Sequence, residues 1–289
     1  IESLSVQPIS KASARQRMGR AGREAPGSCY RLYTEKDFDS LAEDTAPEIL
    51  RVNLASVILL LKASGVEDVV GFDYMDRPER AAFVRALEQL YALGALDDTG
   101  RLSPLGKQMA LFPLDPPYSK VLISSKKYKC TQEAIGVISM LSVDPIFFAP
   151  AERREEARER KGKFVNYDGD HITLLNVLKG YLGVKGDKGW CEENFISARG
   201  MRSVMDIKSQ LTTFCEKQSI DPEVSCGTDY EPLLKCLLSG LFLNTAVIQP
   251  DNSYRTLVGN QTVHIHPTST LFMKKPQTVV YSELVMTSK

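Results

Sequence analysis

The stretch Gln16-Arg17-Met18-Gly19-Arg20-Ala21-Gly22-Arg23 places three arginines, one glutamine and two glycines within eight residues. On a helix, Arg20 and Arg23 face the same way, and Gln16, four residues before Arg20, joins that face. The glycines leave the backbone uncrowded, so that a bulky group can approach it closely. Because the planar guanidinium of arginine meets phosphate oxygens in a two-pronged fashion, the pattern predicts a phosphate clamp. The alternative from charge alone is the solvated basic start of a helix.

The residues around this stretch predict the end of an α/β domain over residues 1–45. Ser10 or Ser13 can cap the helix that carries the stretch, because a side-chain oxygen accepts from the N–H groups of a first helical turn. Residues 28–33 are rich in Tyr, Cys and Leu, which is typical of a strand. The predicted elements are a strand at residues 4–9, a helix at residues 12–21 and a strand at residues 28–33.

Residues 46–112 change character and predict a winged-helix unit. Apolar residues at helical spacing predict a helix from Pro47 to near Gly65 and a second helix at residues 78–93. The sequence Asp97-Asp98-Thr99-Gly100 predicts a tight hairpin between two very short strands. Another helix begins at Ser103-Pro104. Helices followed by a small hairpin are the elements of a winged helix.

Residues 113–228 are predicted to form a helical bundle. Thr131 is expected to cap a helix at residues 132–141, and Asp170 is expected to cap the apolar helix that follows it. Two more helices are expected within residues 190–220. Apolar residues recur at helical spacing in each of these segments, which indicates that one face of each helix is buried.

Residues 229–289 begin with a predicted helix and continue as short strands with turns between them, which indicates a small β-barrel. Because the chain ends soon after a strand, the barrel is expected to be truncated. The predicted elements are a helix at residues 230–241 and strands at residues 245–249, 254–258, 263–266 and 279–285. The fold class predicted is therefore multidomain and mostly α, with a small β-barrel.

Composition limits the kinds of site that the chain can hold. Lys plus Arg and Asp plus Glu number 36 each, so any nucleic-acid site must be a local patch. The six cysteines show no paired spacing, which predicts reduced, mostly buried thiols in an intracellular protein. With three histidines and no ligand spacing, no metal site is predicted. No apolar run is long enough for a bilayer, so no membrane partner is expected.

The stretch at residues 16–23 resembles motif VI of superfamily 2 helicases, and its Gly-Arg-Ala-Gly-Arg form is that of the DEAH-box RNA helicases. The resemblance covers the whole chain, in the family's domain order. It implies a C-terminal fragment with the end of a second RecA-like domain, a winged helix, a helical ratchet domain and an OB-fold. The further segments that resemble the family include residues 6–14, 27–35, 47–54, 112–116, 169–176 and 264–267.

The resemblance implies an ATP-dependent RNA helicase that couples hydrolysis to movement along single-stranded RNA. Gln16 would order the attacking water or the γ-phosphate, and Arg20 and Arg23 would stabilise the transferring phosphoryl group. Arg17 could instead hold the domain together by internal pairing. ATP would act with Mg²⁺, whose ligands are expected outside this chain, because neither Gly-x-x-x-x-Gly-Lys-Ser/Thr nor Asp-Glu-Ala-His occurs. The chain alone is therefore predicted to have no ATPase activity.

Lys274 and Lys275, near Phe272, are predicted to contact single-stranded RNA from a loop of the OB-fold. His264 and His266 alternate on a predicted strand and would point to the same side. His266 is therefore a further RNA-binding candidate, and the alternative is that the two histidines form a structural polar pair. The mixed charges of residues 152–163 are expected to form a solvated face, or else a basic edge along the RNA channel. The resemblance also implies a glycine-rich-patch activator or a spliceosomal or pre-ribosomal complex as partner, and a nuclear or nucleolar location.

Two other interpretations remain open from the sequence. The chain could be a non-catalytic module that binds RNA or a protein without hydrolysis. It could also belong to a related group of DNA helicases, which the form of motif VI and the domain order disfavour.

Overall fold

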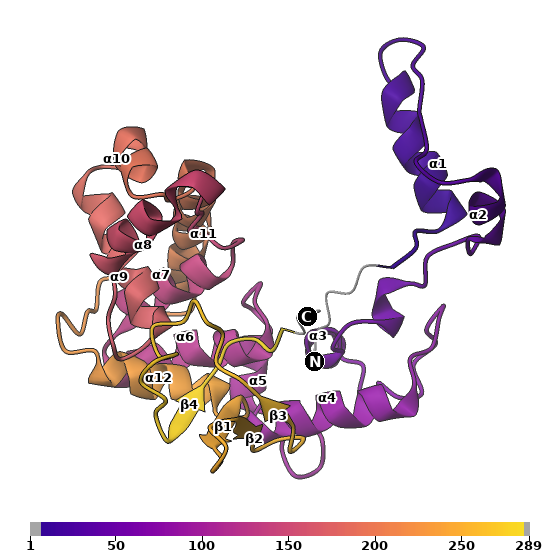
Figure 1. Ribbon diagram of the computed structural model, residues 1–289. Coiled ribbons are helices and arrows are strands. Elements are labelled where there is room, and N and C mark those ends of the chain that lie inside the picture. Colours follow the sequence, from indigo (N-terminus) through magenta and orange to yellow (C-terminus); the bar gives the residue numbers. More distant parts are fainter. Residues whose placement is uncertain (1–6, 286–289) are drawn as a thin grey trace. The chain divides into compact units, whose positions relative to one another are not determined.

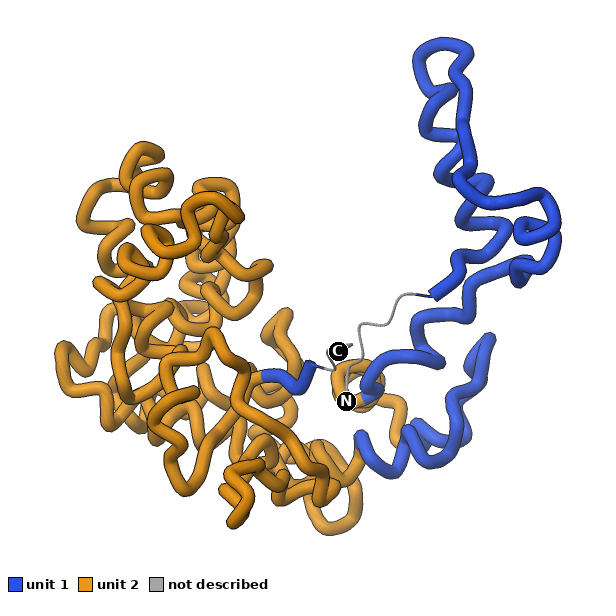
Figure 2. The backbone as a smooth tube through the Cα atoms, in the orientation of Figure 1, with its two compact units in different colours: residues 1–54, 68–86, 283–289 blue, residues 55–67, 87–282 orange. Residues whose placement is uncertain are grey.

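The computed structural model describes residues 7–285. The chain forms two compact units (Figure 2). Unit 1 comprises residues 1–54, 68–86 and 283–289, and unit 2 comprises residues 55–67 and 87–282. Most of the regular structure is helical, and the strands are confined to the C-terminal part (Figure 1). Among the described residues, no helix is both long and apolar enough to cross a membrane.

Unit 1 consists of short helices joined by extended segments. Its helix α2 begins with a capping box, in which the Thr34 hydroxyl accepts from the Asp37 N–H and the Asp37 carboxylate accepts from the Thr34 N–H. The same hydrogen bonds lower the pKa of Asp37. The elements before residue 54 are α1 (Lys11–Gly19), the 3₁₀ helix η1 (Arg20–Gly22), α2 (Glu35–Ser40) and the 3₁₀ helix η2 (Glu48–Leu50).

The two strands predicted in unit 1 are not found among the described residues. Residues 28–33 have no strand structure, and Leu32 is 99 % exposed. A strand needs a neighbouring backbone to pair with, and this segment has none among the described residues. Of the strand predicted at residues 4–9, residues 7–9 have no regular structure and residues 4–6 lie outside the described residues.

The single helix predicted from Pro47 to near Gly65 is also wrong. The chain forms η2, leaves the helical path, and begins α3 (Ala55–Ala63) only at Ala55. The Arg51 side chain, at the end of η2, donates to the Ala46 carbonyl just before η2. Asn53, just before α3, belongs to a residue type whose side chain competes for backbone hydrogen bonds and so favours helix boundaries.

The predicted helix–hairpin–helix sequence is confirmed. Helix α4 (Arg80–Ala92) is followed by an isolated bridge between Leu96 and Leu102 and by α5 (Pro104–Met109). The Ser103 hydroxyl caps α5 by accepting from the Gly106 N–H at 2.9 Å. Gly106 lies against the carbonyl of Ala95, so the turn fixes α5 beside the hairpin.

The rest of unit 2 is a helical bundle around two clusters of buried apolar side chains. One cluster joins α6, α7, α11 and α12, and the other joins α7, α9, α10 and α11. Thr131 is not a cap as predicted, because the helical turn begins one residue earlier, after Cys130. The helices are α6 (Pro116–Tyr128), α7 (Thr131–Leu141), η3 (Ala151–Arg153), α8 (Arg154–Gly162), α9 (Asp170–Gly183), α10 (Lys188–Glu193), α11 (Ala198–Lys217) and α12 (Glu231–Leu241).

A four-stranded antiparallel sheet follows α12. Its strand order is β3-β2-β1-β4, with Ala246 of β1 opposite Thr256 on one side and Val279 on the other. Because β3 and β4 are the edge strands, the described residues show an open sheet rather than a closed barrel. The strands are β1 (Thr245–Ile248), β2 (Tyr254–Thr256), β3 (Thr262–Val263) and β4 (Thr278–Val280).

The cysteines are free thiols, as predicted, and most are buried. Cys29 is exposed and Cys226 is half-buried, whereas the other four are buried. Burial raises the pKa of Cys215 to about 12. Burial and the nearby Glu133 carboxylate raise the pKa of Cys226 to about 12 as well. These thiols therefore stay protonated at neutral pH.

Candidate functional site

The arginine-rich stretch lies on α1 and its continuation η1, close to the predicted helix at residues 12–21. Ser10 is the N-cap: its hydroxyl accepts from the Ser13 N–H at 3.1 Å and lies 2.9 Å from the Thr45 hydroxyl. The backbone stays in the right-handed helical region at Arg20 and Arg23. Gln16, Arg20 and Arg23 therefore keep the helical spacing that places them on one face.

The start of α1 is anchored within unit 1. The ammonium of Lys11 lies 2.7 Å from the carboxylate of Glu43, and that ion pair lowers the pKa of Glu43. Arg15 lies 3.8 Å from the same carboxylate. The backbone N–H groups of Lys11 and Ala12 donate to the carbonyls of Ala42 and Glu43. These contacts fix the first turn of α1, whereas its C-terminal end makes no such contacts with the described residues.

The far end of the helix is open. The side chains of Gln16, Arg17, Arg20 and Arg23 are exposed, and none makes a hydrogen bond or ion pair with another described residue. A Cβ atom added at Gly19 or Gly22 would meet no atom of residues 7–285 within 4 Å. Three guanidiniums and an amide thus stand beside uncrowded backbone, which fits an incoming polyphosphate. The internal pairing considered for Arg17 is not present among the described residues.

The predicted RNA-binding residues lie together on one segment of unit 2, residues 266–275, which we call the 266–275 segment. Lys274 and Lys275 are exposed, and the Lys274 ammonium lies 4.4 Å from the centre of the Tyr167 ring. His266 is not on a strand, because β3 ends at Val263, so the prediction that His264 and His266 share one side of a strand is wrong. The short β3 has only β2 as a partner, which ends the ladder early.

His266 and Asp170 have roles that their sequence positions did not indicate. The Nδ1 atom of His266 lies 2.8 Å from the Thr268 hydroxyl, so the ring stabilises its own turn. Asp170 is the first residue of α9 and not its cap, since Gly169 occupies that position. Its carboxylate instead accepts hydrogen bonds from Ser269 and Thr270, about 100 residues away along the chain.

The charged run at residues 152–163 forms η3 and α8. Arg153 and Glu156 make an ion pair at 2.9 Å, and Ala157 is the buried residue of α8. The Lys161 ammonium donates to the Thr268 carbonyl and lies 5.0 Å from the Phe147 ring. This helix is therefore a solvated, salt-bridged face that also touches the 266–275 segment.

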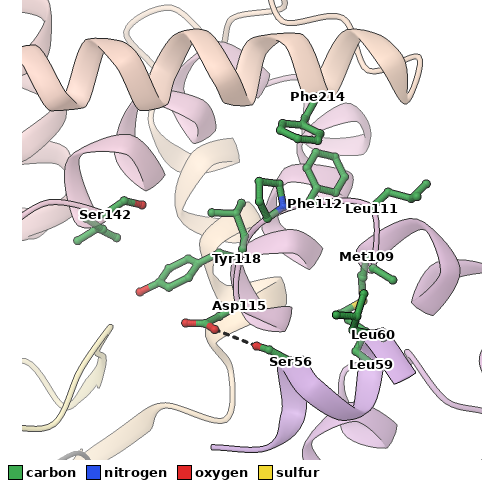
Figure 3. A pocket seen from close by; sticks show the side chains of 14 residues that line it. Ser56, Leu59, Leu60, Met109, Leu111, Phe112, Asp115, Tyr118, Ser142 and Phe214 are labelled. Atoms are coloured by element: carbon green, nitrogen blue, oxygen red, sulfur yellow. Dashed lines mark hydrogen bonds between the residues drawn. The ribbon is translucent and has the colours of Figure 1, made fainter. Parts of the chain in front are cut away.

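A separate pocket of about 680 Å³ lies within unit 2, between α3, α5, α6 and α11 (Figure 3). Its walls are mainly apolar, and the rings of Phe112 and Phe214 pack together on one side. Among the described residues that line it, Asp115, which accepts a hydrogen bond from Ser56, is the only charged one. Among the described residues, no cluster of His, Cys, Asp or Glu is placed to hold a metal ion.

Three domain families match the sequence in the order that the fold suggests. Residues 86–114 match the winged-helix part of the helicase associated domain (HA2), and residues 115–174 match its ratchet-like part. Residues 233–289 match an oligonucleotide/oligosaccharide-binding (OB)-fold.

Several proteins resemble the chain over its whole length. The pre-mRNA-splicing factor ATP-dependent RNA helicase DEAH10 of Arabidopsis thaliana is 44% identical, and the ATP-dependent RNA helicase DHX33 of Homo sapiens is 45% identical. The pre-mRNA-splicing factor ATP-dependent RNA helicase prp22 of Schizosaccharomyces pombe is 45% identical. The chain belongs to the DEAH-box helicases. It spans 42%, 41% and 25% of the lengths of these three relatives and is covered completely in each comparison.

Membership of the DEAH-box helicases explains the order of elements in unit 2, where hairpin, helical bundle and sheet follow one another. The structure also shows a residue that sequence reasoning missed. Tyr167 is 62 % exposed and lies against Lys274, although it was not singled out in the sequence. The available signal was a tyrosine in the polar turn Asn166-Tyr167-Asp168-Gly169, directly before an apolar helix.

Proposed function

We propose that the chain is the C-terminal part of an ATP-dependent RNA helicase that couples ATP hydrolysis to movement along single-stranded RNA. The observation that carries the proposal is the open end of α1 and η1, with Gln16, Arg20 and Arg23 on one face beside two unobstructed glycines. The identity of 44–45% to proteins named ATP-dependent RNA helicases supports it.

The domain division that we propose follows the family order. Residues 1–45 are the end of a second RecA-like domain, residues 46–112 a winged helix, residues 113–228 a ratchet domain and residues 229–289 an OB-fold. The matches to the winged-helix, ratchet-like and OB-fold families at residues 86–114, 115–174 and 233–289 support the last three. The four-stranded sheet would be part of the OB barrel.

In the complete protein, the open end of α1 would meet ATP that is bound mainly by another domain. Mg²⁺-ATP supplies a phosphoryl group with several negative oxygens, and the magnesium ligands would belong to that other domain. The guanidiniums of Arg20 and Arg23 would hold charge on the γ-phosphate, and the amide of Gln16 would orient the attacking water. An arginine in this role contributes roughly 10³–10⁵ in rate.

RNA would bind unit 2 mainly through its phosphates. The exposed Lys274 and Lys275 provide cations on the 266–275 segment, with His266 beside them. Contacts to phosphate are insensitive to sequence and weaken with added salt, because binding releases condensed counterions. The relatives named as pre-mRNA-splicing factors support a nuclear or nucleolar location and RNA-protein complexes as the setting. A glycine-rich-patch protein as activator is proposed from the family resemblance alone.

The proposal is tested by measuring ATP hydrolysis with and without RNA. The complete protein should hydrolyse ATP faster with single-stranded RNA and should unwind an RNA duplex, whereas the 289-residue chain alone should hydrolyse none. A complete protein that binds RNA without hydrolysing ATP would instead be a non-catalytic module. Unwinding of DNA in preference to RNA would indicate a DNA helicase and contradict the proposal.

A further inference from the structure

Asp170 holds the 266–275 segment against the helical bundle. One carboxylate oxygen accepts from the Ser269 hydroxyl at 2.5 Å, and the other accepts from the Thr270 N–H at 2.8 Å. Gly169, and not Asp170, is the N-cap of α9, so both carboxylate oxygens are directed to the distant segment. Hydrogen bonds to a charged acceptor are about twice as strong as those between neutral groups, which makes this a firm attachment.

Two further contacts fasten the same segment to the bundle. Lys161 of α8 donates to the Thr268 carbonyl at 2.9 Å. The Lys274 ammonium lies 4.4 Å from the centre of the Tyr167 ring, a distance at which a cation is attracted to an aromatic face. Tyr167 comes three residues before Asp170, so the ring and the attachment belong to the same turn.

The surface made by these contacts combines an aromatic ring with cations. Tyr167 is 62 % exposed, and the side chains of Lys274 and Lys275 are exposed as well. A ring with this much exposed surface is a place on which a base can stack, and neighbouring ammonium groups attract phosphates. Asp168 and Asp170 bring negative charge to the same turn, which opposes phosphate binding.

We propose that Tyr167 and Lys274 form a contact for single-stranded RNA, with a base stacked on the ring and a phosphate at the ammonium. Asp170 is the positioning residue that holds the 266–275 segment in place for this contact. The inference rests on the proposed function and adds Tyr167 and Asp170 to the RNA-binding residues. If Asp170 acted only through its negative charge, its removal would strengthen RNA binding. If Asp170 acts by holding the 266–275 segment in place, its removal weakens RNA binding. The direction of the change in affinity therefore distinguishes the two roles.

The test is a fluorescence anisotropy titration of a labelled oligouridine with the 289-residue chain at several salt concentrations. Tyr167→Ala should weaken binding about tenfold at every salt concentration, because the ring on which a base stacks is lost. Tyr167→Phe should bind like the wild type, since it keeps the ring. Lys274→Ala should reduce the slope of log affinity against log salt by about 0.7, the value for one lost phosphate contact on a single strand.

Asp170→Ala should weaken binding even though it removes a negative charge. Adding Tyr167→Ala to Asp170→Ala should cost much less than tenfold, since the two residues act on the same contact. Asp170→Asn should retain binding, because its amide can accept from the Thr270 N–H and donate to the Ser269 oxygen. Asp168→Ala is the matched control: it removes an exposed carboxylate from the same turn and should bind as well as or better than the wild type.

If Asp170→Ala does not fold, Ser269→Ala takes its place as the test variant. It removes only one of the two hydrogen bonds to Asp170, and it should also weaken RNA binding. Wild-type affinity, or tighter binding, in folded Asp170→Ala or in Tyr167→Ala overturns the inference and leaves the proposed helicase function standing. Absence of RNA binding by the wild-type chain at low salt overturns the RNA-binding part of the proposed function and the inference with it.

Discussion

Glycines in two helical regions of the molecule serve opposite purposes. A Cβ atom at Gly240 of α12 would lie 2.2 Å from the Pro117 carbonyl oxygen and 2.7 Å from a methyl group of Val121. At Gly19 and Gly22 nothing would lie within 4 Å. The first glycine lets two helices pack closely, whereas the other two leave a surface bare. The same residue type thus marks the core in one region and a candidate binding face in the other.

The burial of the surrounding residues follows the same division. Ala14 is the buried residue of α1, and η1 has none. In α7, nine of eleven residues are buried. Most helical stability in proteins comes from packing, and α1 and η1 pack very little. We therefore infer that the exposed side chains of α1 and η1 serve binding rather than stability. The comparison predicts that substitutions in α1 and η1 affect activity, whereas substitutions at the α6–α12 contact affect stability.

Gly22→Ala is expected to give the largest separation of activity from stability. The methyl group meets no atom of the described residues but would stand on the face where we propose that the nucleotide binds, and a displacement of about 1 Å at a reacting centre can cost ~10²-fold in rate. ATP hydrolysis by the complete protein should fall by about that factor. The unfolding temperature should be unchanged or slightly higher, because alanine favours helix over glycine by about 1 kcal/mol. An unchanged rate of hydrolysis in Gly22→Ala would contradict the idea that Gly19 and Gly22 keep a binding face open.

The control for that variant is Gly162→Ala, at the end of α8. A Cβ atom there also meets nothing within 4 Å, but the site is far along the chain from the arginine-rich stretch. Its rate of hydrolysis should equal that of the wild type.

Gly240→Ala is expected to lower the free energy of unfolding by about 1–3 kcal/mol, the usual cost of an overpacked core. The clash is with the backbone of Pro117, which cannot rotate away, so α6 and α12 must move apart. Chemical denaturation of the chain measures the effect. Gly183→Ala in α9 is the matched helical glycine with free space around it, and it should be neutral or stabilising. Equal stability of the two variants would contradict the packing argument.

The smallest expected effect concerns pH. Burial lowers the pKa of His171 from its ordinary value of 6.5, and the adjacent Asp170 opposes this only in part. The unfolded chain therefore binds a proton at His171 more readily than the folded chain does. The stability contributed by the neutral ring is fully present above about pH 6.5 and is lost as the pH falls below that value.

Thermal unfolding at pH 7.5 and pH 5.5 checks this expectation. The wild type should lose more stability between these values than His171→Gln, which has no ring to protonate. If the wild type and His171→Gln lose the same stability between pH 7.5 and pH 5.5, protonation of His171 does not cause the pH dependence. The exposed Glu43 and Asp37 of unit 1 titrate in a lower pH range, because their pKa values are lowered.

Local patterns in the sequence predicted local structure well. The helix that carries the arginines, the Ser103 cap and the hairpin between Leu96 and Leu102 all depend on residues within a few positions of one another. The spacing of Gln16, Arg20 and Arg23 is equally local, so the candidate nucleotide face was visible before the fold was known. The identity of the chain as a DEAH-box helicase also followed from one short stretch.

Features that depend on distant residues were not predicted. Asp170 was expected to cap its own helix but binds residues about 100 positions away. Residues 28–33 have strand propensity, yet they form no strand because none of the described residues pairs with them. Tyr167 gained significance only when the fold placed Lys274 over its ring. In each case the deciding partner is set by tertiary structure, which spacing along the chain does not reveal.

The account depends most directly on the two guanidiniums at the open end of α1 and η1. The decisive measurement is RNA-stimulated ATP hydrolysis by the complete protein carrying Arg20→Ala and Arg23→Ala together. We predict that the rate of hydrolysis falls by about 10³–10⁵-fold in the double variant. The control is Arg15→Ala, on the same helix but beside Glu43, and its rate should be close to that of the wild type. Undiminished hydrolysis by the double variant would contradict the account.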